Sequence, residues 1–357
     1  MIAGVLTLVV IAVVLIGAGG AGPVRVRPPA THTATKTATL TATRTRTVTP
    51  TRTTPAREPT SFAVGARNLV LNEPSTPSAA TGTSGGQPVR TLPTLLLYPT
   101  FGRPGTPDRT GAPLDRAAGP YPLIIFSQGF DQPVSAYRGM LDAWAQAGFV
   151  VAAPTYPGTY AGDPHELDES DIVNHPGDLK FILSTLTADT TGSGGLSGLF
   201  NPNEVAVAGQ SDGGDVSLAV AADSCCQISA IKAAVILSGA ELSGFGGTYY
   251  TSGSVPLLVT QGSADTINLP GCSAELYDQA PAPKYYVDLL GQAHLPPYTQ
   301  PGPANDYVNA AVIAFLDQYL RNRAGPWQRM VAAGGQTNVA TVTDAPQLSG
   351  ASTYCPA

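Results

Sequence analysis

The sequence predicts an α/β protein whose mostly parallel central sheet carries helices on both faces. Short β-branched apolar runs alternate along the chain with longer segments of helical period, the pattern of strand–helix–strand units. Several of these runs lack polar alternation, as strands covered on both faces do. One run ends in the glycine-dense stretch GQSDGG and continues as a helix. Because ligands of such sheets bind beyond the carboxyl ends of the strands, a site is expected there.

The predicted elements follow one another along the chain. The runs that we interpret as strands cover residues 91–100, 121–129, 149–157, 204–209, 232–239, 255–262 and 284–291. The segments of helical period cover residues 134–148, 171–188, 213–222 and 305–321. The last helix has an apolar stripe formed by Val308, Val312, Phe315, Leu316 and Tyr319. We therefore expect one folded domain over residues 88–325, followed by a tail without clear period at 326–357.

Residues 1–23 are predicted to be a signal peptide or a membrane anchor. Residues 1–22 are almost purely apolar and end in small residues that signal peptidase accepts, although no Lys or Arg precedes the run. We favour cleavage; because the run is long enough to span a bilayer, an uncleaved anchor is the alternative. No cysteine follows closely, which argues against a lipoprotein anchor. Either way we expect an exported protein, extracellular or held at the cell surface through its N-terminus.

Residues 24–87 are predicted to be a disordered spacer rich in Thr and Pro. Threonine occupies every odd position from 31 to 53, and the residues between are mostly small, basic or proline. Since no hydrophobic face forms, this period of two indicates an extended stalk, often O-glycosylated, and not a strand. Polar sequence rich in Gly and Ser continues to about Gln87.

The composition describes a globular, acidic domain behind a basic spacer. Of the 357 residues, 43% are hydrophobic and 12% charged, which is not the composition of a disordered chain. Residues 25–67 contain eight Lys or Arg against one acid, whereas the rest of the chain beyond them has 11 basic and 24 acidic residues. This excess of negative charge in the folded part argues against nucleic acid as a partner.

Four cysteines, at 225, 226, 272 and 355, indicate disulfides. Their even number fits an oxidising compartment, and their spacing matches no zinc pattern. Because neighbours in sequence rarely bridge each other, we expect Cys225 and Cys226 each to reach Cys272 or Cys355. Which pairs with which stays open, and a bridge to Cys355 would tether the tail to the domain.

Residues 209–213, Gly-Gln-Ser-Asp-Gly, stand between a strand and a helix and match the Gly-x-Ser-x-Gly nucleophile elbow. A serine on so sharp a turn has a strained backbone, and the residues two positions to either side crowd each other unless they lack a β-carbon. The turn pushes the hydroxyl clear of the sheet. Ser211 is therefore the candidate nucleophile.

A serine hydroxyl needs a base to take its proton, and the base needs an acid to orient it. His294 is the only histidine after Ser211, and it follows a predicted strand, which makes it the candidate base. Asp265 follows the preceding predicted strand and is the candidate acid; its rivals Asp288 and Asp223 lie within a strand and at a helix end. The other histidines, His32, His165 and His175, precede the serine.

Acyl transfer also needs N–H donors for the developing oxyanion. The backbone N–H of Asp212, the residue after the nucleophile, is one candidate. The N–H of Phe130 is the other, because it follows Gly129 in the loop after a predicted strand and glycine lets the backbone approach. Plain core packing of Phe130 is the alternative.

These residues together resemble the α/β-hydrolase superfamily, in the branch of dienelactone-hydrolase-like enzymes, platelet-activating-factor acetylhydrolases and cutinase-like polyester hydrolases. The resemblance rests on YPLIIFSQGF, GQSDGG, QGSADTI, GQAH and NHPGDLKFILSTL, and it covers about residues 88–323. It implies an α/β-hydrolase fold with a single catalytic domain, no cofactor and hydrolysis of small or polymeric esters through an acyl-enzyme. No contiguous cap domain is visible, because the longest insertion, residues 158–170, is short and acidic.

The sequence departs from that branch at two positions. Gln210 and Asp212 flank the serine, where cutinase-like and acetylhydrolase members commonly have His and an apolar residue. The charge of Asp212 argues against an apolar polymer groove, and serine at position 211, where dienelactone hydrolases proper use cysteine, indicates simple carboxylic esters. A cutinase-like polyester hydrolase or lipase is the alternative, followed by a peptidase of the same fold and a non-catalytic surface binding module.

Four aromatic residues are candidates for the substrate pocket, with core packing as the equal alternative for each: Phe130, Tyr156, Tyr160 and Tyr298. The acids of residues 158–170 suggest a calcium loop, but their spacing matches no known one, so no metal is expected. We expect a monomer.

Overall fold

One sheet runs through the whole domain and sets the position of every loop considered below. The computed structural model describes residues 61–75, 79–164, 166–193, 195–334, 338–345, 347–348 and 355. The strand order is β11-β10-β9-β8-β7-β5-β6-β3-β1-β4, and β2 pairs with β3. The strands are β1 (Ala63–Pro74), β2 (Gly82–Ser84), β3 (Gln87–Thr100), β4 (Arg109–Thr110), β5 (Tyr121–Ser127), β6 (Val150–Pro154), β7 (Phe200–Gln210), β8 (Ile231–Leu237), β9 (Leu257–Gly262), β10 (Lys284–Leu289) and β11 (Ala340–Thr343).

The helices lie between these strands. They are α1 (Arg138–Gln146), α2 (His175–Thr191), α3 (Asp212–Ala222), α4 (Pro270–Gln279), α5 (Pro296–Thr299), α6 (Pro303–Arg321) and α7 (Pro326–Gly334). Three short 3-10 helices precede α1, precede α2 and follow β8: η1 (Val134–Tyr137), η2 (Glu169–Asn174) and η3 (Ser243–Phe245). None of the helices within the described ranges is both long and apolar enough to cross a membrane.

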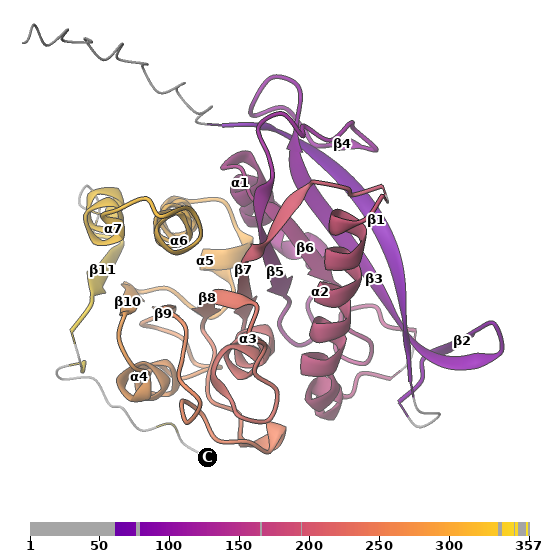
Figure 1. Cartoon of the computed structure of the whole chain (residues 1–357). Helices are drawn as coiled ribbons and strands as arrows, with labels where there is room; N and C mark the ends of the chain where they lie inside the picture. Colours follow the sequence, from indigo (N-terminus) through magenta and orange to yellow (C-terminus); the bar gives the residue numbers. More distant parts are fainter. Residues whose placement is uncertain are drawn as a thin grey trace, which may run out of the picture. The chain divides into compact units, whose positions relative to one another are not determined.

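The central strands are parallel, as the apolar runs predict. β6, β5, β7, β8, β9 and β10 pair in parallel, and β3 and β11 add antiparallel strands at the two sides. Every residue of β5 is buried because successive side chains enter opposite cores: Leu123 and Ile125 one, Ile124 and Phe126 the other. Helices α2, α3 and α4 cover the first face, and α1 and α6 cover the second (Figure 1). The predicted fold class is confirmed.

The predicted domain limits are wrong at both ends. β1 (Ala63–Pro74) belongs to the sheet and pairs with β3 along its whole length, so the spacer does not extend to Gln87. Beyond its first four residues β1 alternates between partly buried and exposed positions. Polar residues occupy several of these positions, and for this reason the sequence of the strand resembles that of a linker. At the other end, α7 and β11 form where only a tail is expected. The predictions for residues 1–60 lie outside the described residues.

The disulfides correct one prediction and agree with another. Cys225 and Cys226 are bonded to each other, contrary to the expectation that each reaches a distant cysteine. Both lie in the turn after α3, where the N–H of Cys225 donates to Asp223 Oδ1 and the N–H of Cys226 donates to the Asp223 carbonyl oxygen. Neither can bond to Cys272, because Cys272 is bonded to Cys355. Cys272, in the first turn of α4, is bonded to Cys355 and so ties the C-terminal region to the domain.

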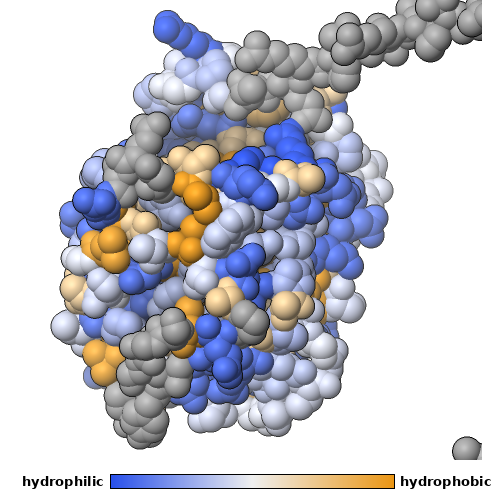
Figure 2. Space-filling view, turned by 90° about the vertical axis from the view of Figure 1, so that its left-hand side faces the viewer, coloured by the Kyte–Doolittle hydropathy of each residue, from blue (hydrophilic) through white to orange (hydrophobic). Residues whose placement is uncertain are grey.

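The surface over α7 and β11 is mixed in character. On this face hydrophobic residues form small groups separated by hydrophilic ones (Figure 2). Leu290 and Val331, the large apolar side chains exposed after β10 and in α7, are only 37% and 41% exposed. The apolar surface on this face is therefore divided into small areas.

Candidate active site

The turn between β7 and α3 has the geometry that its glycines predict. Ser211 has φ 54° and ψ −127°, a conformation that only a few non-glycine residues adopt. A β-carbon on Gly209 would lie 1.9 Å from the carbonyl oxygen of Gly213, and one on Gly213 would lie 2.0 Å from that of Ser127. Only glycine fits at either position. The surrounding packing holds Ser211 in a strained conformation that costs about 1–3 kcal/mol.

His294 and Asp265 are brought together, although they lie in different loops. Nδ1 of His294 is 2.7 Å from Oδ2 of Asp265, and the two residues are only 6% and 3% exposed. Asp265 follows β9 and His294 follows β10, so their contact rests on the parallel pairing of those two strands. The rivals do not take this place: Asp288 lies within β10, and the Asp223 carboxylate accepts from Cys225.

The Asp265 carboxylate is held by three further donors. Its Oδ1 accepts from the N–H groups of Ile267 and Asn268 at 2.9 and 3.1 Å, and its Oδ2 also accepts from Gln261 Nε2 at 3.0 Å. Together these three donors fix the orientation of the carboxylate. The carboxylate therefore accepts a hydrogen bond from Nδ1–H, which leaves the lone pair of the neutral imidazole on Nε2.

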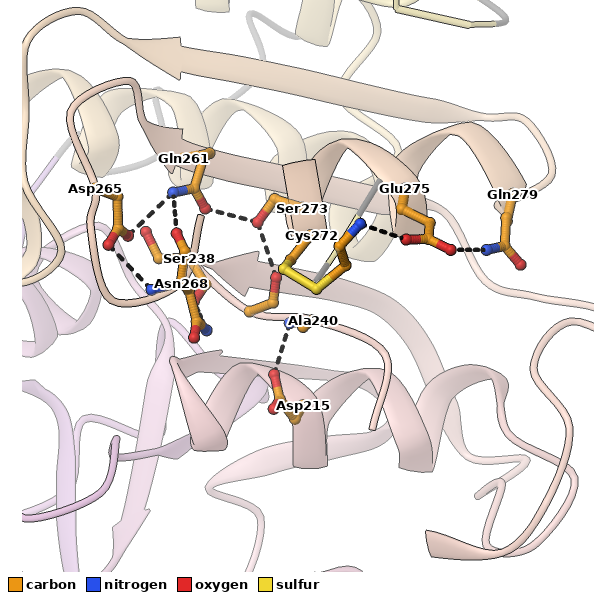
Figure 3. The surroundings of a disulfide bond; sticks show 12 residues. Asp215, Ser238, Ala240, Gln261, Asp265, Asn268, Cys272, Ser273, Glu275 and Gln279 are labelled. Atoms are coloured by element: carbon orange, nitrogen blue, oxygen red, sulfur yellow. Dashed lines mark hydrogen bonds between the residues drawn. A yellow bond between two sulfur atoms is a disulfide. The ribbon is translucent and has the colours of Figure 1, made fainter. Parts of the chain in front are cut away.

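The Gln261 side chain is itself fixed by α4. Ser273 Oγ lies 2.7 Å from Gln261 Oε1 and 2.8 Å from the carbonyl oxygen of Gly239. Figure 3 shows this chain of contacts running from Asp265 through Gln261 to Ser273, next to the disulfide of Cys272. The orientation of the acid therefore depends on the packing of α4 against the sheet.

The Nε2 atom of His294 contacts a residue that sequence reasoning did not assign to the site. The side-chain amide nitrogen of Gln210 lies 3.1 Å from it. Within the described part of the chain, the Ser211 hydroxyl makes no hydrogen bond to His294. The sequence signal for Gln210 is its place directly before the serine, where it differs from the residue common in the hydrolases that the sequence resembles.

Both predicted oxyanion donors lie near Ser211. A β-carbon on Gly129 would lie 3.1 Å from Ser211 Cβ, so the loop after β5 passes close to the serine. The N–H of Gly129 donates to Tyr137 Oη, and among the described residues the N–H of Phe130 donates to none. Asp212 is the first residue of α3, where backbone N–H groups have no partner within the helix.

The side chain of Asp212 has a perturbed acidity. Burial and the negative charge of Glu169 raise the pKa of this carboxyl to about 6, against the opposing effects of its own backbone N–H and of His294. Among the described residues its buried Oδ2 has no hydrogen-bond partner. Near neutral pH an ionisable carboxyl therefore stands next to the N–H predicted to bind an oxyanion.

Two of the four aromatic residues predicted to line a substrate pocket are too deeply buried to do so. Tyr156 and Tyr298 are fully buried; Tyr156 stacks on His175 and contacts Ser127 Oγ, and Tyr298 Oη contacts Ser238 and Thr260. A side chain with no exposed surface cannot line an open pocket, so core packing describes these two. Phe130 and Tyr160 are partly exposed. His165 lies outside the described residues.

A cavity of about 620 Å³ lies beside the elbow. Its lining includes Asp215, Ala240, Glu241, Tyr249 and the Cys272–Cys355 disulfide, of which Figure 3 shows Asp215, Ala240 and the disulfide. Asp215 N–H donates to the carbonyl oxygen of Ser211 at 3.0 Å, so the cavity begins one helical turn from the serine. Burial raises the pKa of the Glu241 carboxyl to about 7. Nowhere in the described ranges do three or more His, Cys, Asp or Glu residues form a group that could hold a metal ion.

Comparison with known proteins identifies the fold. No protein-family model matches the chain, and no curated protein matches it in sequence. Among solved structures, the chain is similar to a ferulic acid esterase from Streptomyces cinnamoneus, with a TM-score of 0.53 and 22% sequence identity over 76% of this chain and 93% of the esterase. The chain thus has the α/β-hydrolase fold, with Ser211, Asp265 and His294 at the carboxyl ends of β7, β9 and β10.

Proposed function

We infer that the protein is an exported serine hydrolase that cleaves carboxylic esters through an acyl-enzyme. Ser211 is the nucleophile, His294 the general base and Asp265 the acid that orients it. The N–H groups of Phe130 and Asp212 form the oxyanion hole. The observation that carries this proposal is the 2.7 Å contact between His294 and Asp265 beside an elbow that holds Ser211 at positive φ.

The chemistry follows from the positions of these groups. Ser211 Oγ attacks the ester carbonyl carbon while His294 Nε2 takes its proton, and the charge that develops on the carbonyl oxygen is met by the two N–H groups. Collapse of the intermediate expels the alcohol, which receives the proton from His294. Water then repeats the sequence on the acyl-enzyme, releases the acid and restores Ser211. The Asp265 carboxylate stabilises the imidazolium in both halves.

Hydrolysis of simple esters fits the surroundings best. The cavity beside Asp215 offers space for one part of an ester. The similar solved structure is described as an esterase, which supports ester over amide cleavage. An apolar polymer or lipid is the second candidate, because Ile267 and Leu269, close to Asp265 in the chain, are 66% and 40% exposed and give that rim an apolar character.

The proposal is tested with purified protein on p-nitrophenyl acetate and butyrate. We expect hydrolysis by the wild type and its loss in Ser211→Ala, whereas Ser184→Ala, at an exposed position of α2, keeps the parent rate. A fluorophosphonate probe should label the wild type and not Ser211→Ala. Parent activity in Ser211→Ala would show that the nucleophile is assigned wrongly. Clearing of polyester or lipid emulsions distinguishes the second candidate.

A further inference from the structure

A continuous chain of hydrogen bonds reaches the base from the side opposite Asp265. The N–H of Gly129 donates to Tyr137 Oη at 3.3 Å, and Tyr137 Oη donates to Gln210 Oε1 at 2.7 Å. Gln210 Nε2 lies 3.1 Å from His294 Nε2 and 3.4 Å from the His294 carbonyl oxygen. The loop after β5 that contains Gly129 and Phe130, here called the oxyanion loop, is therefore connected to His294 through the Tyr137 hydroxyl and the Gln210 amide.

The direction of every bond in this chain is fixed by its two ends. A backbone N–H can only donate, so the Gly129 amide makes Tyr137 Oη its acceptor and Tyr137 the donor to Gln210 Oε1. That assigns the amide nitrogen, a donor, to the end that faces His294. At the other end the Asp265 carboxylate can only accept, which places the imidazole proton on Nδ1 and leaves Nε2 as an acceptor. Gln210 therefore donates to Nε2.

Nε2 has one lone pair in the plane of the ring, and the proposed reaction needs that lone pair for the Ser211 hydroxyl. It cannot accept a linear hydrogen bond from Gln210 and from Ser211 at the same time. Gln210 is fully buried, and a β-carbon on Gly129 would lie 2.5 Å from its Oε1, so the amide fits its place closely. The Gln210 amide can leave Nε2 only when the residues packed around it move.

We propose that Gln210 is a positioning residue that occupies His294 Nε2 in the ligand-free protein and yields it to Ser211 when substrate binds. This inference rests on the proposed function. The release is coupled to the oxyanion loop, because Gly129, which anchors Tyr137, directly precedes Phe130, whose N–H meets the substrate carbonyl. A substrate that draws this loop toward its carbonyl oxygen loosens the anchor of the amide. The base is thus held in place before binding and freed by it.

The contact itself is tested without chemistry, by NMR of the ¹⁵N-labelled, ligand-free full chain. We expect a scalar coupling across the N–H···N hydrogen bond between Gln210 Nε2 and His294 Nε2. Gln210→Met, which keeps the size of the side chain but has no donor, should move the His294 Nε2 resonance toward that of an acceptor without a partner. The Nδ1–H resonance that reports on Asp265 should persist. An unmoved Nε2 resonance in Gln210→Met would overturn the proposal.

The competition between Gln210 and Ser211 for His294 Nε2 is tested by the rate of fluorophosphonate labelling. Gln210→Met should be labelled about fivefold faster than the wild type, the factor that corresponds to one ordinary hydrogen bond. Tyr137→Phe, which removes only the anchor of the amide, should shift the Nε2 resonance in the same direction and serves if Gln210→Met does not fold. If Gln210→Met folds and is labelled no faster than the wild type, the proposal that Gln210 competes with Ser211 for His294 Nε2 is wrong. Absence of labelling in the wild type contradicts the proposed function instead, and the NMR measurement still decides the contact.

Discussion

The two nitrogens of His294 stand in different situations. Nδ1 faces a carboxylate that is fixed by Gln261 and by two backbone N–H groups, and this arrangement is complete without a ligand. Nε2 faces the amide of Gln210, which stands where the Ser211 hydroxyl is needed. The orientation of His294 at Nδ1 is therefore built into the fold, whereas its proposed contact with the Ser211 hydroxyl at Nε2 would require a rearrangement.

Asp265→Asn tests the contact at Nδ1 of His294, which is complete without a ligand. It should have the largest effect on the rate. An amide can present its N–H₂ to Nδ1 and so favour the wrong tautomer, and we expect kcat for a p-nitrophenyl ester to fall by about 10⁴-fold with the fold unchanged. Asp288→Asn, a rival from the sequence, is the matched control and should stay within about twofold of wild type. Equal losses in the two variants would contradict the assignment of the acid.

Gly209→Ala tests the tight turn that holds Ser211, the proposed nucleophile. Because the new methyl group would lie 1.9 Å from the Gly213 carbonyl oxygen, β7 and α3 must separate, and we expect a loss of about 3–5 kcal/mol in the free energy of unfolding. Gly177→Ala, where a β-carbon in α2 meets nothing within 4 Å, should instead stabilise by about 0.5–1 kcal/mol. Denaturant unfolding of both proteins measures the difference, and an unaffected Gly209→Ala would disprove the tight turn.

Asp212→Asn tests, through the pH dependence of the rate, how the charge of Asp212 affects the proposed oxyanion donors. The Asp212 carboxyl has its pKa raised to about 6, so it is neutral at pH 5 and ionised at pH 8. Negative charge next to the oxyanion donors opposes the transition state, and we expect the variant to raise kcat/KM about tenfold at pH 8 and by less than about twofold at pH 5. Parallel pH profiles for variant and wild type would rule out this electrostatic effect.

The raised pKa of the Asp212 carboxyl also predicts how the stability of the fold depends on pH. A pKa raised in the folded state means that the protonated carboxyl stabilises the fold at low pH and that this contribution is lost as the pH rises through about 6. Asp212→Asn should therefore raise the melting temperature at pH 8 relative to wild type, and the difference should shrink toward pH 4. A difference that does not depend on pH would contradict this assignment.

Ser273→Ala should have the smallest effect, because Ser273 is three contacts away from His294, through Gln261 and Asp265. Without the hydroxyl, Gln261 Oε1 loses a donor at 2.7 Å and Asp265 is held less firmly. We expect kcat to fall about two- to fivefold with KM unchanged, the effect of about one weak hydrogen bond. Ser184→Ala is the control at an exposed position. A change in KM alone would place Ser273 in substrate binding instead.

Much of the fold could be predicted because its signals are local. The apolar runs of β5, β8 and β9 need only their own residues to indicate buried parallel strands, and the two glycines around Ser211 indicate the turn on their own. β1 could not be predicted in this way, since its outer half alternates with polar residues and is defined by its pairing with β3. β11 likewise depends on β10.

The parallel sheet, the elbow and the order in which Ser211, Asp265 and His294 follow their strands could all be predicted from the amino-acid sequence alone. These features depend on periodicity and on glycine spacing, which a chain carries before it folds. The bond between Cys225 and Cys226 and the contact between Gln210 and His294 are visible only in the folded protein. Such contacts depend on which distant groups arrive at the same place, and an amide or a thiol in the sequence does not specify its partner.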